Sequence, residues 1–190
     1  DGKKVTASTT FTAPAAEDGK DSVSGAVDVT FKFKGGDYLA GKTLVAFETC
    51  QYKGKDVFVH EEIEDAPQTT YVPDGHTTFV DNATKDHIAG ITEKMSLTDT
   101  VYYENLKSGE TYKVTGVLMD KETGKEVEAT KEFTIDPKPI VDVNGNEVKD
   151  QDGNTMMAPV SGSVDLTFEF EGSDELKGKT LVAFETMTYK

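Results

Sequence analysis

The sequence predicts an all-β chain that contains parts of two copies of one antiparallel β-sandwich domain. Apolar and polar residues alternate in short runs rich in threonine and valine, which is the pattern of half-buried strands. Clusters of glycine, lysine and acidic residues between the runs are turn signals. The nine residues Gly41–Thr49 return unchanged as Gly178–Thr186, 137 positions later. A repeat of this period is a whole domain and not a solenoid unit.

The alternating runs cover most of the chain, and no segment carries a helical stripe of apolar residues. Runs spaced by roughly 10–15 residues and joined by turns are typical of antiparallel β-sandwiches. The predicted strands are Val5–Phe11, Ala26–Phe33, Lys42–Phe47, Thr69–Val72, Thr98–Tyr103, Thr111–Leu118, Val127–Ile135, Val164–Phe170 and Thr180–Phe184.

Two connections can be interpreted in more detail. Met119–Glu126 joins two alternating runs and predicts a hairpin loop. Residues 136–160 are polar and rich in turn signals, so they predict a long loop. Matching Gly2–Thr12 with Gly124–Thr134 gives an offset of 122 residues, whereas the later match gives 137, so this loop carries an insertion of 15 residues. Surface loops tolerate such insertions.

The offsets divide the chain near Pro73. Residues 1–73, the first repeat, correspond to the later strands of one domain, and residues 74–190, the second repeat, to the earlier strands of the next. The residues of the second repeat that precede about residue 124 have no counterpart in the first repeat. The second ends at Lys190, which matches Lys53, and has no counterpart of residues 54–73. We therefore expect a fragment in which neither domain is complete.

Composition argues against several classes of function. The 190 residues include 35 acidic and 20 basic side chains, with a net charge of −15 and no arginine, which disfavours binding to nucleic acid or to an anionic membrane. No apolar stretch approaches the roughly 18 residues of a membrane span, and the first residues lack the pattern of a signal peptide. The single cysteine, Cys50, excludes a disulfide framework, and its counterpart is Met187.

Val45-Ala46-Phe47-Glu48 and its copy at 182–185 resemble the signature of VaFE-repeat domains, also called Thr–Gln ester-bond domains, of Gram-positive cell-surface adhesins. Three further segments resemble this family in order and spacing: His60–Thr69, Leu97–Leu106 and Tyr112–Asp120. The resemblance implies tandem Ig-like (CnaB-like) antiparallel β-sandwich domains. In each, a threonine of the first strand and a glutamine of the last are joined by an intramolecular ester, with loss of ammonia.

The resemblance also implies the residues of the site. Gln68 matches the glutamine that becomes the ester, and His60, eight positions earlier, matches the histidine that activates the hydroxyl. Glu48 matches the acidic residue that ends the signature, and Glu185 is its copy in the second repeat. Asp99, in Thr-Asp-Thr, matches the second acidic position.

The nucleophile implied by the resemblance is the first threonine of a Thr-Thr pair that opens the domain. This is Thr77, with Thr78 and Thr84 as alternatives. Two arrangements of the bond stay open. The partner of Gln68 lies before residue 1 and that of Thr77 after residue 190, or Gln68 and Thr77 meet within one chain or between chains, in circularly permuted order.

The chemistry explains why such residues are needed together. A threonine hydroxyl is a weak nucleophile and a carboxamide a poor electrophile, but fixing them side by side can supply effective molarities of roughly 10⁵–10⁸ M. The imidazole of His60 takes the hydroxyl proton. Two carboxyl groups in a poorly solvated site cannot both stay ionised, so one of Glu48 and Asp99 in each complete domain is expected to hold a proton and polarise the amide.

The function implied by the resemblance is a structural stalk region of a bacterial surface adhesin or pilus-like protein, attached to the cell wall. The ester is expected to add mechanical, thermal and proteolytic stability, and it forms once, so we do not expect an enzyme in the ordinary sense. Expected partners are neighbouring repeats and, through other domains, host ligands, with no cofactor and no metal. The alternatives are a stalk cross-linked by Lys–Asn or Lys–Asp isopeptide bonds and a module that binds a host ligand.

Overall fold

A computed structural model describes residues 4–16 and 19–189, and every regular element in those ranges is a strand or a short 3₁₀ helix. The prediction of an all-β chain with antiparallel sheets is confirmed. Contacts divide the chain into two compact units, Asp1–Leu39 and Ala40–Lys190. The division of the two repeats near Pro73 stays a prediction, and residues 1–3, 17, 18 and 190 of the predicted domains lie outside the described residues.

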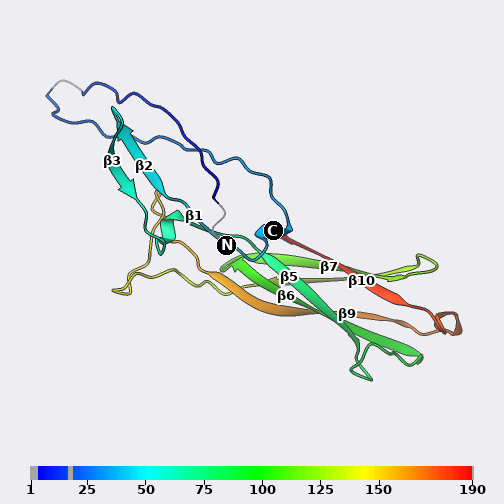
Figure 1. Cartoon of the computed structure of the whole chain (residues 1–190). Coiled ribbons are helices and arrows are strands. Elements are labelled where there is room, and N and C mark those ends of the chain that lie inside the picture. The colour runs from blue at the N-terminus through cyan, green and yellow to red at the C-terminus, as the bar shows by residue number, and fades with distance from the viewer. Residues whose placement is uncertain (1–3, 17–18, 190) are drawn as a thin grey trace. The chain divides into compact units, whose positions relative to one another are not determined.

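Six strands of the second unit form two three-stranded antiparallel sheets, in the orders β5-β6-β9 and β10-β7-β8 (Figure 1). Each predicted strand after residue 98 becomes one of them, and the predicted hairpin loop joins β7 to β8. Their bounds are β5 Asp74–Asp81, β6 Lys94–Lys107, β7 Thr111–Asp120, β8 Glu126–Thr134, β9 Pro159–Glu171 and β10 Leu181–Tyr189.

The inward faces of the two sheets share one apolar core. Leu166 and Phe168 of β9 and Val114 of β7 are at most 2% exposed. Outward positions carry threonine, and Thr98 and Thr167 meet across β6 and β9 with their hydroxyl oxygens 3.0 Å apart. The alternation in the sequence thus becomes one buried and one solvated face on each sheet.

Among the described residues, the first repeat supplies four short strands and two 3₁₀ helices. β1 pairs with β4, and β2 pairs with β3, both antiparallel. The bounds are η1 Asp37–Leu39, β1 Thr43–Val45, β2 Glu48–Tyr52, β3 Lys55–His60, η2 Ala66–Gln68 and β4 Thr69–Tyr71, while η3 Asp174–Leu176 lies in the second repeat.

Two predicted strands, Val5–Phe11 and Ala26–Phe33, are wrong, because these segments form no strand. Their counterparts in the second repeat, β8 and β9, pair with β7 and β6. The first repeat contains no counterpart of β6 or β7, and a strand without a neighbour leaves its backbone groups without hydrogen-bond partners. These segments therefore stay irregular.

The apolar side chains of the same segments are exposed for the same reason. Val27 is 43% and Phe31 is 36% exposed, whereas their counterparts Val164 and Phe168 are 8% and 1% exposed. A side chain that fills the core of the second repeat has no facing sheet in the first.

Three strands were absent from the sequence prediction: β2, β3 and β5. The first five residues of β5 are exposed, and only its last three are half-buried or buried. An edge strand of this kind carries little apolar alternation, which is why the pattern does not reveal it. The predicted insertion in 136–160 forms isolated bridges, from Pro139↔Met157 to Lys149↔Thr155.

Gly116 of β7 allows the two sheets to approach. A Cβ at this position would overlap Leu166 Cδ2 and would lie 2.8 Å from Phe168 Cζ. We predict that Gly116→Ala lowers the free energy of unfolding by about 1–3 kcal/mol, because an overfilled core must shift. Urea denaturation measures this. Gly90→Ala is the control, since nothing lies within 4 Å of its added Cβ. Equal loss in both variants would contradict the packing argument.

Candidate functional site

Asp99 interrupts the apolar inward face of β6. It lies between the buried residues Leu97 and Val101 in the alternation of the strand, and it is 0% exposed. An aspartate is almost never fully buried without a partner. The other sheet supplies that partner.

The partner is Glu185 of β10. Its neighbours on the same face, Ala183 and Met187, pack against the core, so the glutamate points between the sheets. Thr77 lies on the edge strand β5 and shares its inward face with Phe79, which is paired directly with Asp99 in the ladder of β5 and β6. Three strands therefore direct a hydroxyl and two carboxyls to one place, and we call these residues the Thr77 group.

The Thr77 group raises the pKa of one of its carboxyls, that of Glu185. Burial, followed by the hydrogen bond and charge of Asp99, raises the pKa of Glu185 to about 8, and a hydrogen bond with Thr77 opposes this rise. Both carboxylate oxygens of Asp99 and Oε1 of Glu185 are buried. If both carboxyls were ionised, none of these three oxygens would have a hydrogen-bond donor among the described residues. A proton on Glu185 supplies that donor, so Glu185 is the acid of the pair at neutral pH and Asp99 accepts its hydrogen bond.

Glu48, the copy of Glu185, has a different neighbour. The ladder of β2 and β3 places Glu48 opposite His60, with 3.9 Å between Glu48 Oε2 and His60 Nδ1. The other ring nitrogen, Nε2, lies 3.1 Å from Asp65 Oδ2. The imidazole is thus held between two carboxylates.

Gln68 ends the turn that begins at Asp65. Its N–H donates to Asp65 O at 3.1 Å, and its own carbonyl accepts from Ala46 N–H at 2.9 Å. The hydroxyl of Thr69 also donates to Asp65 O, at 2.7 Å. These bonds tie the glutamine to the strand that leads into Glu48. We call Glu48, His60, Asp65 and Gln68 the Gln68 group.

The predicted site residues therefore fall into two groups. The strand that follows Gln68, β4, pairs with β1, whereas Thr77 lies on β5, which pairs with β6. Of the alternative nucleophiles, Thr78 lies on the opposite face of β5, and Thr84 donates its hydroxyl to Ile88 O at 3.0 Å. Thr77 alone among the three meets the carboxyl pair.

The expectation that Glu48 or Asp99 holds a proton in each complete domain stays a prediction. In this chain the carboxyl that faces Asp99 is that of Glu185, the copy of Glu48. The reason is that β6 and β7 pair with strands of the second repeat, so the second copy of the glutamate is the one brought to Asp99. Glu48 and Glu185 occupy the same position of the repeat.

Asp65 was missed by sequence reasoning. It closes the acidic run 61–65, which resembles a solvated surface, and nothing in its residue type marks it as different. Its position three residues before Gln68 is the only signal that could have pointed to it. The structure places it at the N-cap of η2 and against His60.

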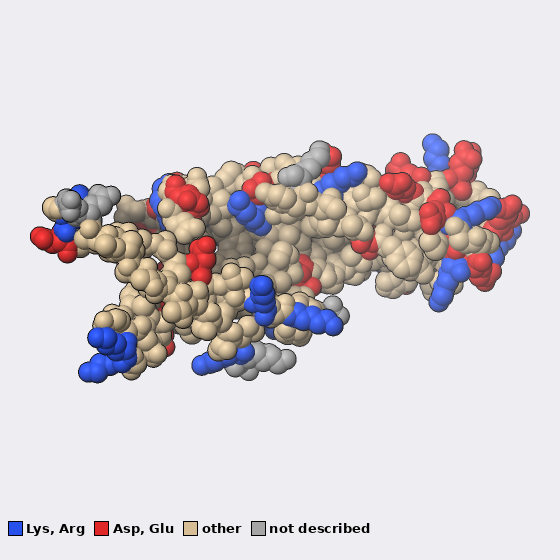
Figure 2. All heavy atoms as spheres, turned by 90° about the horizontal axis from the view of Figure 1, so that it is seen from above, with Lys and Arg blue, Asp and Glu red and all other residues tan. Residues whose placement is uncertain are grey.

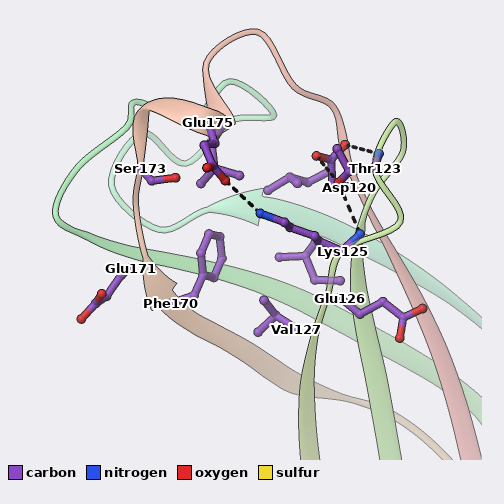
Figure 3. Close-up of a pocket in the computed structure, with 12 residues that line it drawn as sticks. Asp120, Thr123, Lys125, Glu126, Val127, Phe170, Glu171, Ser173 and Glu175 are labelled. Atoms are coloured by element: carbon purple, nitrogen blue, oxygen red, sulfur yellow. Dashed lines mark hydrogen bonds and ion pairs between the residues drawn. The ribbon is translucent and has the colours of Figure 1, made fainter.

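A cavity of about 270 Å³ lies where β7 turns into β8, and none of the predicted site residues lines it (Figure 3). Its apolar residues include Phe170 and Val127, and Lys125 pairs with Glu175 at its rim at 2.8 Å. The carboxylate of Asp120 accepts from the hydroxyl of Thr123 at 2.8 Å. Acidic and basic side chains mix at this end of the sandwich (Figure 2). Lys125 and Asp120 therefore already have partners within the chain.

The described residues contain neither a metal-binding cluster nor a membrane-spanning helix. No group of three His, Cys, Asp or Glu side chains in 4–16 and 19–189 could hold a metal ion. No helix in the same ranges is long and apolar enough to cross a membrane.

Comparison with protein families gives one match, which covers nearly the whole chain. The family described as "T-Q ester bond containing domain" matches residues 1–72 and 74–190. No curated protein matches the chain.

Among solved structures, the chain is similar to a bacterial adhesin from Mobiluncus mulieris described as containing intramolecular disulfide, isopeptide and ester bond cross-links. Its two crystal forms give 18% and 16% identity with TM-scores of 0.40 and 0.39. Each covers 62% of this chain, which spans 44% of the adhesin chain. This likeness is too low to bear on the fold or the site.

The raised pKa of Glu185 gives a pH prediction. The folded chain keeps a proton on Glu185 up to about pH 8, whereas the unfolded chain releases it near its ordinary value of 4.5. This contribution to stability is therefore complete below about pH 4.5 and is lost as the pH rises to about 8. Urea midpoints measured across this window should fall in the parent chain and in Glu48→Gln. They should fall less in Glu185→Gln, and an unchanged pH dependence in that variant would contradict the assignment.

Proposed function

Because the chain belongs to the family of T-Q ester bond containing domains, we propose that it is a structural stalk region of a bacterial surface adhesin, sealed by autocatalytic Thr–Gln esters. Thr77 is the nucleophile of the second repeat, and Gln68 is the glutamine that becomes the ester in the first. The observation that carries this proposal is the hydroxyl of Thr77 beside two carboxyls, of which Asp99 is fully buried and Glu185 has a pKa raised to about 8. A proton donor beside a nucleophile is what an amide needs in order to be attacked.

The proposed reaction uses both groups of residues in one complete domain. The Oγ1 of the threonine attacks the side-chain carbonyl carbon of the glutamine, and the C–N bond breaks. The imidazole at the position of His60 takes the hydroxyl proton and passes it to the leaving nitrogen, which departs as ammonia. The protonated carboxyl at the position of Glu185 donates to the amide oxygen as negative charge develops there.

Asp99 acts through Glu185 in this mechanism. As a buried acceptor it keeps the proton on Glu185 at neutral pH and fixes the direction of the O–H bond. Asp65 has the corresponding role at the imidazole, since its carboxylate holds Nε2 of His60 at 3.1 Å. Each reacting group thus has a second carboxylate behind it that sets its orientation.

The proposed benefit is mechanical. A bond between the first and the last strand of a domain restricts the unfolded chain as a disulfide does, by about 4–5 kcal/mol for a loop of more than 100 residues. It also prevents the end strands from being pulled off one at a time. Such a bond suits a protein on the outside of the cell wall that contains a single cysteine. The ester forms once per domain, so the chain does not turn over substrate. The partners of the chain are neighbouring repeats of the same protein.

The test completes the second repeat with the chain's own residues. Tyr189-Lys190 matches Tyr52-Lys53, so a copy of residues 54–73 can be added directly after Lys190. We predict that this extended chain weighs less than its composition requires, by one ammonia. Tandem mass spectrometry should find Thr77 joined to the added copy of Gln68, and hydroxylamine should cleave the link.

Four variants of the extended chain locate the chemistry. Thr77→Val and Ala in place of the added glutamine should keep the full mass, while Thr78→Val, on the opposite face of β5, should lose ammonia like the parent. Asp99→Asn should slow the reaction by roughly 10²- to 10³-fold, the loss typical for one misplaced donor at a developing charge. An extended chain that folds and retains all its nitrogen would overturn the proposed function.

A further inference from the structure

The linker between the two repeats is short and stiff. β4 ends at Tyr71 and β5 begins at Asp74, so only Val72 and Pro73 connect them. The ring of Pro73 fixes the φ angle of that residue and disfavours a helical backbone at Val72. Few torsions are left to move, so bending between the repeats depends on the contacts beside the linker.

Both backbone groups of Val72 are hydrogen-bonded, one to each repeat. Its N–H donates to Lys42 O at 2.9 Å, and Lys42 directly precedes β1 of the first repeat. Its carbonyl accepts from Asn105 Nδ2 at 3.2 Å, and Asn105 belongs to β6 of the second repeat. A continuous path of hydrogen bonds therefore runs from the first repeat through the linker to the second.

The backbone explains why an asparagine lies at this place. The ladder of β5 and β6 ends at the pair Asp74↔Glu104, and Pro73, the next residue along, has no N–H with which to continue it. The ladder of β6 with β9 shifts register here, and Asn105 has a φ of 58°. Asparagine is one of the few residues besides glycine that adopt this left-handed conformation readily. Its side-chain amide supplies the bond to the linker that the ladder cannot.

A second contact joins the repeats at the turn before β1. A Cβ built on Gly41 would lie 3.4 Å from Glu104 Oε2 and 3.5 Å from Asp74 Oδ2. Its counterpart in the second repeat, Gly178, has a similar backbone, with φ of 73° against 68°. Among the described residues, nothing lies within 4 Å of a Cβ built on Gly178. The space beside Gly41 is thus filled by carboxylates of the other repeat.

We propose that these contacts hold the two repeats in one fixed orientation, and that Asn105 is the residue on which the joint depends. Two separate contacts are needed, because a single hydrogen bond would leave the repeats free to turn about it. Motion between domains is the default where their interface is not large and apolar. This joint prevents it with a bound linker and close packing. The proposal does not depend on the Thr–Gln ester.

The consequence concerns the reach of the stalk proposed above. Repeats joined by flexible linkers point in many directions, so the ends of the array come close together. Repeats with a fixed joint keep their direction from one to the next. The interaction surface is formed by the turn at Gly41 on one repeat and by the adjoining ends of β5 and β6 on the other.

Distances between spin labels measure the joint directly. In a Cys50→Ser background, Thr70→Cys labels the first repeat and Glu128→Cys the second, both at exposed positions. A control pair, Glu128→Cys with Ser163→Cys, lies wholly within the second repeat. Pulsed electron paramagnetic resonance on the 190-residue chain should give a distribution across the joint that is as narrow as that of the control pair.

Three substitutions of Asn105 remove its amide donor. Asn105→Gly keeps the left-handed backbone accessible, and Asn105→Asp keeps the shape of the side chain, while Asn105→Ala keeps neither. All three should broaden the distribution across the joint by up to ~8 Å, the spread of two flexible residues. The control pair should keep its width.

A matched pair of glycine variants tests the second contact. Gly41→Asp places a third carboxylate beside Asp74 and Glu104, so repulsion should open the joint and broaden the distribution. Gly178→Asp has a closely similar backbone strain without those neighbours, and its distribution should match that of the parent.

The outcomes decide the proposal. A parent distribution as broad as that of Asn105→Ala would show a flexible joint and overturn it, and so would a narrow distribution in Asn105→Gly. If a variant of Asn105 also disturbs the control pair, Gly41→Asp decides, and a narrow distribution there counts against the joint. None of these measurements involves loss of ammonia, so failure of the joint and failure of the ester are distinguishable.

Discussion

The arrangement depends on which strands obtain backbone partners. β6 and β7 each have two edges, and β5, β9, β8 and β10 of the second repeat occupy all four. A segment of the first repeat with nearly the same pattern as β9 finds no free edge on β6, the strand with which β9 pairs. Backbone hydrogen bonding therefore decides which of the two similar segments, Ala26–Phe33 or β9, becomes a strand of the sandwich. A backbone N–H or C=O group cannot be buried without a hydrogen-bond partner.

The same pairing decides the electrostatics of the site. Asp99 is carried inward by β6, and β7 brings β10 and Glu185 to face it. Neither carboxyl would be unusual on an exposed strand. Between two sheets, burial and the charge of Asp99 disfavour the ionised form of Glu185 and raise its pKa to about 8. The glutamate can then act as a proton donor at neutral pH. The hydroxyl of Thr77 reaches this pair because β5 pairs with β6 and directs Thr77 toward the opposite sheet, where Glu185 lies.

Duplication gives the chain two forms of one glutamate position. At Glu48 the carboxylate meets an imidazole, and at Glu185 it meets a carboxyl and a hydroxyl. Duplication thus places the same side chain in two different electrostatic environments. It also explains the exposed apolar residues of the first repeat, such as Val27 and Phe31, whose counterparts fill the core of the second.

The sequence by itself determined the all-β class, the strands after residue 98, the repeat and the candidate residues, because alternation and identity are local properties of the chain. It could not determine that Val5–Phe11 and Ala26–Phe33 stay irregular, since pairing depends on which other strands are present. The tertiary structure also decided that Asp99 meets Glu185 and not Glu48, that Thr77 and not Thr78 faces the pair, and that Asp65 belongs beside His60. Each of these depends on the direction and neighbours of a strand, which only the assembled sheets define.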